Sequence, residues 1–490
     1  MFQPTFESLS TYKCPDWFRD VKFGIWSHWG AQSVPMYGDW YARFMYVEGH
    51  SQYLYHLRHY GHPSKFGYKD LVKLWKAEAF NPEELMDLYY KAGARYFVGQ
   101  AMHHDHFFNY PSKYNRFNST KMGPMKDICG LWKAAADNMK MPFGLAEHLS
   151  ASFTWWFTNK GADEFGPYAG VPYDGNDPEY SDFYFNNHEH KMNQHESAQW
   201  HTENKEFQEY WLKVFKELIN LYSPDLLYTD GPLPFGCGGA QWNDVPTERD
   251  NPNFRVGLEA VSYYYNKSIE KYGENRVVYT QKDRRPEICC VGVLDIEKSQ
   301  LPGINPIPWQ TDTCVGHWFY DVRVPHKRPG HIIEMLVDII SKNGTMLLSV
   351  LQLPDGTIDD ETRYLLRELE SWFKINNEAV YDTRPWRVYG EGVSGVIIDG
   401  FKEDEVSWTS SDYRFVCKDD GKTLYAYMMR VPDNRVAVIK SLTPDDKVLN
   451  VSLLGAGKME FNQFAGTLTV KLPDKLPTTH TNCLKIEIAG

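Results

Sequence analysis

The feature that most constrains the fold is an alternation of short apolar runs with longer, helically periodic segments, from about residue 20 to residue 350. Such alternation is typical of parallel strands joined by crossover helices. We expect strands at 22–30, 94–104, 141–150, 226–231, 276–282, 288–297 and 344–351, and one more near 314–320. About eight strand–helix units make up a TIM-like (β/α)8 barrel, which is therefore the predicted fold.

Boundary signals support the helices between these strands. The segment 81–93 opens with Asn81 and Pro82, a capping residue followed by a first-turn residue, and it ends at Gly93. A second helix is expected over 206–224, where Pro224 stops it, and a third over 359–381.

After residue 381 the pattern changes to short alternating runs such as TLYAYMMRV and RVAVIKSL, separated by Gly, Asp and Asn. Runs of this kind predict antiparallel strands joined by turns. We therefore expect two domains: a catalytic barrel over 1–383 and a C-terminal antiparallel β-sandwich over 384–490.

Charge and composition exclude several classes of protein. The chain has 52 Lys and Arg against 64 Asp and Glu, a net charge of −12, and no basic run, so we expect no nucleic-acid partner. No stretch approaches the ~18 apolar residues of a membrane helix, and the start lacks a signal peptide, so we expect no membrane association. The predicted location is the cytoplasm, or the periplasm or exterior if a leader has been removed. The sequence makes no prediction of oligomeric state.

Polar residues cluster at the carboxyl ends of the predicted strands, where barrels of this type build their active sites. They are His28, His103, His104, Asp105, His106, Glu147, His148, Asp230, Asp295 and Glu297. Two carboxylates on separate strand ends favour acid/base or nucleophilic chemistry on an acetal. The 75 aromatic residues, 16 Trp, 32 Tyr and 27 Phe, are in keeping with a sugar pocket, which uses rings as flat platforms.

Two of these positions allow more than one interpretation. Asp230 follows the buried run LLYT and precedes Gly231, which would fix its carboxylate at the pocket floor, although Asp-Gly pairs are also common in turns. His104 and His106 lie on one face of an extended strand and could hold zinc together with His148 and Asp230. A zinc site would need further ligands at the later strand ends. These strand ends carry neither a lysine of the kind that is carboxylated nor a second histidine, so we expect no metal. The loop histidines His188, His190, His195 and His201 are expected to be solvated.

Several motifs, in order along the chain, resemble those of glycoside hydrolase family 29, the α-L-fucosidases. They are WFRDVKFGIWSHWG (17–30), GDWY (38–41), KAGARYFVGQAMHHDHF (91–107), SPDLLYTDG (223–231), PWQTDTCVGHWFYD (308–321) and VDIISKNGTMLLSVLQLPDGTI (337–358). The family's barrel and C-terminal β-sandwich agree with the organisation expected from periodicity.

The resemblance implies a retaining exo-α-L-fucosidase that removes terminal fucose from a fucosylated oligosaccharide or polysaccharide without a cofactor. Asp230 matches the family's nucleophile. By position, the residues implied to hold the sugar are His28, Asp39, Trp40, His103, His104 and His148, with Trp309 and Trp318 along its apolar face and Lys298 beside it.

The resemblance does not give the general acid/base directly. Many family members carry Glu after the Trp of the PWE motif, and here that position is Gln310, which cannot transfer a proton at neutral pH. We therefore predict Glu297, at the end of VGVLDIE and followed by Lys298, as the acid/base. Asp295, Asp312 and Glu287 remain alternatives.

Three other functions stay open at this stage. An α-L-galactosidase could use the same scaffold, since L-galactose differs from L-fucose only by a hydroxyl at C6. Gln310 would also suit a fucose-binding protein that has lost turnover. A metal-dependent hydrolase is the third alternative.

Overall fold

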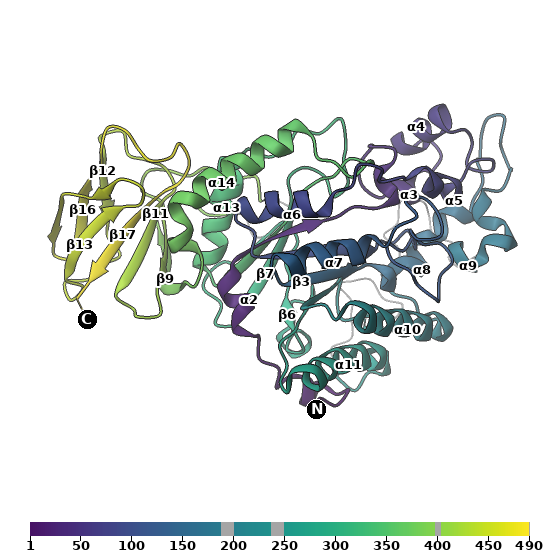
Figure 1. Cartoon of the computed structure of the whole chain (residues 1–490), viewed down its shortest axis with the longest axis horizontal. Coiled ribbons are helices and arrows are strands. Elements are labelled where there is room, and N and C mark those ends of the chain that lie inside the picture. The colour runs from purple at the N-terminus through teal and green to yellow at the C-terminus, as the bar shows by residue number, and fades with distance from the viewer. Residues whose placement is uncertain (188–199, 237–248, 397–402, 490) are drawn as a thin grey trace.

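A computed structural model of the chain describes residues 1–187, 200–236, 249–396 and 403–489. Its central element is a sheet of eight parallel strands (Figure 1). These strands are β1 (Phe23–Ser27), β2 (Tyr96–Met102), β3 (Phe143–Glu147), β4 (Leu226–Thr229), β5 (Val278–Gln281), β6 (Val293–Leu294), β7 (Trp309–Cys314) and β8 (Gly344–Ser349).

The sheet closes into a barrel. The strand order is β6-β5-β4-β3-β2-β1-β8-β7, and a parallel bridge between Asp295 and Gln310 joins its two edges. Two further backbone bonds continue this seam, from Ile296 N to Gln310 O and from Lys298 N to Asp312 O, each 2.9 Å long. The predicted (β/α)8 barrel is therefore confirmed, and its eight described strands leave no edge open to pair with another chain.

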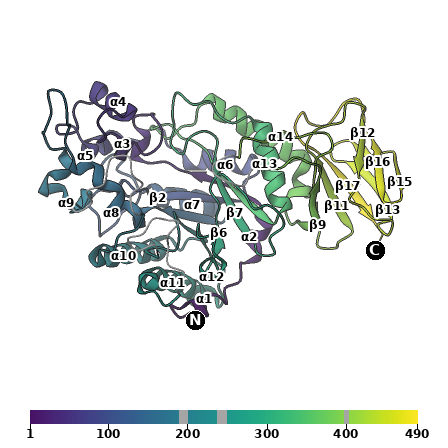
Figure 2. The same cartoon turned by 180° about the vertical axis from the view of Figure 1, so that it is seen from behind.

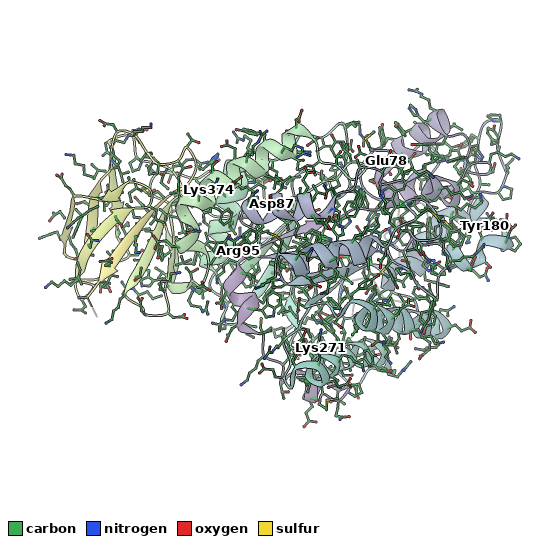
Figure 3. All side chains as sticks on the ribbon, viewed as in Figure 1. Glu78, Asp87, Arg95, Tyr180, Lys271 and Lys374 are labelled. Carbon is green, nitrogen blue, oxygen red and sulfur yellow. The ribbon has the colours of Figure 1, made fainter. Side chains whose placement is uncertain are left out.

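Helices cover the outside of the barrel. The longer ones are α6 (Pro82–Lys91), α7 (Ile128–Asn138), α10 (Lys205–Tyr222), α11 (Arg255–Tyr272), α13 (Pro329–Ser341) and α14 (Asp360–Val380). The predicted helices at 81–93, 206–224 and 359–381 are confirmed to within two residues, and Asn81 caps α6 as expected. Charged residues such as Asp87, Lys271 and Lys374 project from the outer surfaces of these helices (Figure 3).

Two strands differ from the prediction. The sixth is only two residues long, and part of the predicted segment 288–297 belongs instead to the short helix α12 (Pro286–Cys289). The strand expected near 314–320 lies at 309–314, where each residue pairs with β8 from Gly344 to Ser349. Gln310 and Asp312 point into the barrel, so the inward face of this strand is polar and lacks the apolar signal of the others.

Short segments after the early strands gather at the end of the molecule opposite the C-terminal sheets (Figures 1 and 2). They include α3 (Tyr41–Phe44), α4 (Ser51–His59), α5 (Tyr68–Leu71), α8 (Ser152–Trp155) and α9 (Ser181–Tyr184). Two further short α-helices, α1 (Phe6–Leu9) and α2 (Asp16–Val21), precede β1. None of the described helices is long and apolar enough to cross a membrane.

The C-terminal region consists of two antiparallel sheets with a separate apolar core between them, which confirms the predicted sandwich architecture. The six-stranded sheet has the order β14-β13-β17-β11-β10-β9 and the three-stranded sheet β12-β16-β15. Their strands are β9 (Arg384–Glu391), β10 (Tyr413–Cys417), β11 (Thr423–Met428), β12 (Val436–Ile439), β13 (Val448–Leu453), β14 (Gly457–Lys458), β15 (Phe461–Phe464), β16 (Thr467–Lys471) and β17 (Asn482–Ile488). The domain boundary between 383 and 384 stays a prediction.

A buried ionic contact joins the barrel to the six-stranded sheet. The guanidinium of Arg414 on β10 donates to the carboxylate of Asp338 on α13, and both side chains are at most 2% exposed. Lys342 lies 3.1 Å from the second oxygen of the same carboxylate. Helix α14 adds a contact of its own, because the indole of Trp372 donates to the carbonyl of Thr481 at 2.7 Å.

We expect Arg414→Met to lower the free energy of unfolding by about 3–5 kcal/mol, because it strips the buried Asp338 carboxylate of its closest partner. Arg430, just after β11, provides the matched control, since its pair with Glu334 also joins the C-terminal region to α13 but leaves the arginine 46% exposed. Replacing Arg430 by Met should cost at most about 1 kcal/mol. Guanidinium unfolding midpoints would measure both, and equal losses would contradict the assignment.

Candidate active site

A cavity of about 970 Å³ opens at the carboxyl ends of the barrel strands. Ten of the eleven site residues predicted from the sequence line it: His28, Asp39, Trp40, His103, His104, His148, Asp230, Glu297, Lys298 and Trp318. The eleventh, Trp309, does not. All ten lie at the ends of β1, β2, β3, β4, β6 and β7 or on the loops that follow these strands, so closure of the barrel brings them together.

Asp230 stands directly after β4 at the floor of the cavity. Its Oδ1 accepts a hydrogen bond from Tyr228 Oη at 3.1 Å and lies 3.0 Å from Lys282 Nζ, while Oδ2 lies 3.4 Å from His104 Nε2. Burial alone would raise the pKa of this carboxyl, but Lys282 and His104 outweigh burial and hold the pKa well below its ordinary value. Asp230 is therefore a fixed, ionised carboxylate.

Glu297 faces the same space from the loop after β6. Its Oε2 lies 2.7 Å from Lys282 Nζ, and its Oε1 accepts a hydrogen bond from the indole of Trp318 at 3.1 Å. Burial raises the pKa of Glu297 above its ordinary value, although Lys282 opposes the shift. The environments of Glu297 and Asp230 thus push their pKa values apart, which is the pattern of an acid paired with an ionised nucleophile.

Lys282 holds these two carboxylates at a defined spacing. Two oxygens at 3.0 and 2.7 Å from one nitrogen lie no more than 5.7 Å apart. Carboxyl groups about 5–5.5 Å apart are typical of retaining glycosidases, and inverting enzymes need about 6.5–9.5 Å to admit a water. The nearest oxygens of Asp230 and Glu297 are therefore close enough for the retaining arrangement.

Lys282 was not predicted from the sequence, where later strand ends were considered only for a lysine of the kind that is carboxylated in metal sites. It is the last residue of the predicted strand 276–282, so the signal was present. In addition to Asp230 and Glu297, it lies 3.2 Å from Asp312 Oδ2. Burial lowers the pKa of a lysine, but these carboxylates overcome burial and keep the pKa of Lys282 well above its ordinary value.

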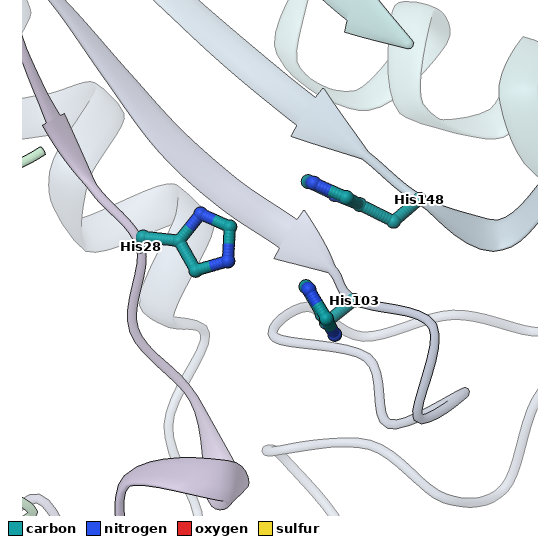
Figure 4. Close-up of side chains that lie close together, drawn as sticks. All are labelled: His28, His103 and His148. Carbon is teal, nitrogen blue, oxygen red and sulfur yellow. The ribbon is translucent and has the colours of Figure 1, made fainter. Parts of the chain in front are cut away.

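Three histidines from neighbouring strand ends converge beside the carboxylates (Figure 4). The rings of His28, His103 and His148 lie 4.7–5.3 Å apart, centroid to centroid. Burial lowers the pKa of all three, that of His148 to about 3, so the rings are neutral. Both nitrogens of His28 and Nδ1 of His148 have no hydrogen-bond partner among the described residues. Neutral, unpartnered imidazoles suit the recognition of uncharged hydroxyl groups.

The zinc set considered from the sequence is not formed. His106 lies away from the cavity, and its two ring nitrogens contact the carbonyl of Phe183 at 2.9 Å and the hydroxyl of Tyr210 at 2.8 Å. His28, His103 and His148 do present one nitrogen each within 4.8 Å of one another. That trio contains no carboxylate and differs from the set built on His104 and His106.

The two loops that close the cavity from the side are joined to each other. Asp39 Oδ1 accepts the backbone N–H of Phe319 at 2.7 Å, which fixes the Trp40 loop against the Trp318 loop. The indole of Trp318 also lies 5.4 Å from the His28 ring, and Lys298 Nζ lies 5.0 Å from the Trp318 ring centroid.

The prediction that Trp309 lines the cavity is wrong. Its ring is fully buried on the outward face of β7, where the indole donates to the carbonyl of Lys342 at 3.0 Å. Because side chains alternate along a strand, its neighbour Gln310 points into the barrel instead. There Gln310 accepts from Tyr96 Oη at 3.0 Å and donates to Asp295 Oδ1 at 2.7 Å, and it does not line the cavity.

The other acid/base alternatives take different places. Asp312 and Asp295 lie beneath Lys282 and are at most 1% exposed, whereas Glu287 lies on α12 and does not line the cavity. The expectation of a solvated His201 is wrong, since this residue is fully buried beside Phe235. His188, His190 and His195 lie outside the described residues.

Known proteins resemble the chain over its whole length. It is 28% identical over 491 residues to tissue alpha-L-fucosidase of Rattus norvegicus, covering 98% of this chain and 90% of that protein. An alpha-fucosidase of Thermotoga maritima, solved with a mechanism-based inhibitor, shares its fold with a TM-score of 0.74 at 24% identity, over 99% of this chain and 100% of that one. So does a Bacteroides thetaiotaomicron GH29 alpha-L-fucosidase trapped as a covalent intermediate, with a TM-score of 0.66 at 16% identity over 97% and 95%.

Family models match both parts of the chain. The alpha-L-fucosidase C-terminal domain matches residues 406–487. The alpha-L-fucosidase model itself matches residues 1–378, which include the barrel and every cavity residue described above. The chain therefore belongs to the α-L-fucosidase family of glycoside hydrolases.

Proposed function

We propose that the protein is a retaining exo-α-L-fucosidase in which Asp230 is the nucleophile and Glu297 the general acid/base. The observation that carries the proposal is the contact of both side chains with Lys282, which places Asp230 Oδ1 and Glu297 Oε2 no more than 5.7 Å apart. The covalent intermediate trapped in the Bacteroides thetaiotaomicron relative supports the same two-step route.

In the first step the Asp230 carboxylate attacks C1 of the fucoside from the face opposite the leaving group. The bond from C1 to the aglycone oxygen breaks, and Glu297 gives its proton to that oxygen. The product is a β-linked fucosyl ester of Asp230. The low pKa of Asp230 supplies the carboxylate, and the raised pKa of Glu297 supplies the proton.

In the second step Glu297, now a carboxylate, removes a proton from a water that attacks C1. The ester bond breaks, Asp230 recovers its negative charge, and fucose leaves with its original α configuration. Lys282 contacts both carboxylates, so one ammonium faces whichever oxygen carries the charge in each step.

The remaining cavity residues fit recognition of the sugar. The neutral rings of His28, His103 and His148 bind hydroxyl groups, and Asp39 accepts from one more. His104 bonds to the carbonyl of His148 at 2.9 Å and to Asp230, and so positions the nucleophile. Trp40 and Trp318 cover the apolar face of the ring and its C5 methyl, and Lys298 lies beside Trp318.

The alternatives are not favoured. Loss of turnover was inferred from Gln310, but Gln310 lies inside the barrel, where a proton donor could not reach the glycosidic oxygen. No specific contact among the described cavity residues favours an α-L-galactosidase over a fucosidase. The substrate class is a fucosylated oligosaccharide or polysaccharide. Location in the periplasm or exterior after loss of a leader, or otherwise in the cytoplasm, stays a prediction.

We expect Asp230→Gly to lower kcat/KM on aryl α-L-fucosides by at least about 10³-fold, because the nucleophile is lost. Added azide should restore turnover and yield β-L-fucosyl azide, since azide then attacks from the face that Asp230 occupied. NMR of the product gives its configuration. Asp283→Gly serves as a control at a cavity carboxylate outside the reaction, and azide should change neither its rate nor its product. An α-configured azide from the Asp230 variant would contradict the nucleophile assignment.

We expect Glu297→Gln to lower kcat/KM about 10²–10⁴-fold on fucosyl oligosaccharides but much less on substrates with good leaving groups, which need no proton. The variant should also lose the alkaline limb of the pH profile. In the native enzyme that limb reports Glu297, whose pKa lies above its ordinary value of 4.5, so activity falls as the pH rises through it. Equal losses on both substrate types would contradict this role.

A further inference from the structure

Beneath Lys282 lie two buried carboxyl groups that the reaction does not use. Asp295 follows β6, and Asp312 lies on β7 two residues beyond Gln310, the bridge partner of Asp295. Because alternate residues of a strand share a face, Gln310 and Asp312 both point into the barrel, where Gln310 contacts Asp295. The Asp312 side chain interacts with that of Asp295, and neither residue is more than 1% exposed.

The hydrogen bonds of the two carboxyl groups leave one oxygen of each without a donor in the described part of the chain. Asp295 Oδ1 accepts from Gln310, and Asp312 Oδ2 accepts from Tyr228 Oη at 2.9 Å and faces Lys282. The other oxygen of each carboxyl, Asp295 Oδ2 and Asp312 Oδ1, has no donor among the described residues. Two buried carboxylates cannot donate to each other, whereas one proton between these oxygens satisfies both.

We propose that Asp295 and Asp312 share a single proton and act as one positioning unit of charge −1, which holds Lys282 between the nucleophile and the acid/base. The inference rests on the proposed function of Asp230 and Glu297. Neither Asp295 nor Asp312 touches the reacting atoms.

The proton resides on Asp295. Asp312 contacts the ammonium of Lys282 and the hydroxyl of Tyr228, while the only other contact described for the Asp295 carboxyl is the neutral amide of Gln310. Burial raises the pKa of Asp295 well above its ordinary value, and the charge of Asp312 raises it further, against the effect of Lys282. The charged and titratable groups around the pair are Tyr96, Tyr228, Asp230, Lys282 and Glu297, from β2, β4, β5 and the loop after β6.

The single negative charge of the Asp295–Asp312 pair suits a reaction in which the charge around Lys282 stays constant. In the first step the negative charge on Asp230 disappears into the ester, and a negative charge appears on Glu297. The two carboxylates and Lys282 therefore keep the same total charge throughout. A second charge on Asp295 would disfavour ionised Asp230 and Glu297 alike and would draw Lys282 down into the barrel.

Asparagine variants test the shared proton. In Asp295→Asn the introduced amide can still donate a hydrogen bond to Asp312. In Asp312→Asn the introduced amide can donate to Asp295, which then becomes ionised. Each single variant therefore keeps one negative charge. We expect each single variant to retain kcat/KM to within about 10-fold, and the double variant to lose at least about 10-fold more than the product of the two. Independent effects that simply multiply would overturn the proposal.

The pH profile separates the two charge states of Asp295. If Asp295 is neutral, Asp295→Asn leaves the alkaline limb, which reports Glu297, in place to within about 0.3 pH units. If Asp295 is ionised in the native protein, its replacement removes a nearby negative charge, and the limb moves to lower pH by about one unit. Asp295→Leu is the matched control: it has no donor for Asp312 and should lose at least about 30-fold more kcat/KM than Asp295→Asn.

A neutron crystal structure of the unmodified protein at pH 6 gives a readout that does not depend on activity or on folding of the variants. We expect a deuteron between Asp295 Oδ2 and Asp312 Oδ1. Its absence, with both carboxyls ionised, would overturn the shared proton even if the azide experiment upheld Asp230 as the nucleophile. Failure of that experiment, with the deuteron in place, would overturn the proposed function alone.

Discussion

The active site depends on the placement of one ammonium group among three carboxyl groups. Lys282 Nζ lies 2.7–3.2 Å from oxygens of Asp230, Glu297 and Asp312, in a position that is 6% exposed. A buried ammonium is costly unless it is paired, and so are buried carboxylates, so these four groups stabilise one another only as a set. The same set fixes the spacing between Asp230 and Glu297 and lowers the pKa of Asp230, whereas burial keeps that of Glu297 raised.

The barrel makes this set possible because it presents strand ends from distant parts of the chain at one edge. Asp230, Lys282 and Glu297 come from the ends of three successive strands, β4, β5 and β6. Below them, Tyr96, Gln310, Asp295, Asp312 and Tyr228 form a connected polar network inside the barrel. The interior of a (β/α)8 barrel is usually packed with branched apolar side chains. The polar residues of β7 depart from this rule, and through Asp312 they contact Lys282 in the active site.

The sequence predicts most of this arrangement where the signal is local. Asp230 ends an apolar strand, and His103 and His104 end another, so their position at the cavity follows from the strand assignment. The register of β7 could not be predicted in this way, because Gln310 and Asp312 face inwards and remove the apolar alternation on which strand prediction depends. The error for Trp309 follows from the same register, and the burial of His201 depends on contacts such as Phe235 that are distant in the sequence.

The cavity combines the charged groups around Lys282 with neutral histidines, and this combination matches the needs of the reaction. Positive charge develops at C1 and the ring oxygen in the transition state, so net negative charge beside these atoms is favourable. The carboxylates around Lys282 carry a net negative charge, and burial keeps His28, His103 and His148 uncharged beside them. If these rings were protonated, they would repel the developing cation and pair with Asp230. Burial of the histidines therefore serves catalysis as well as the recognition of sugar hydroxyls.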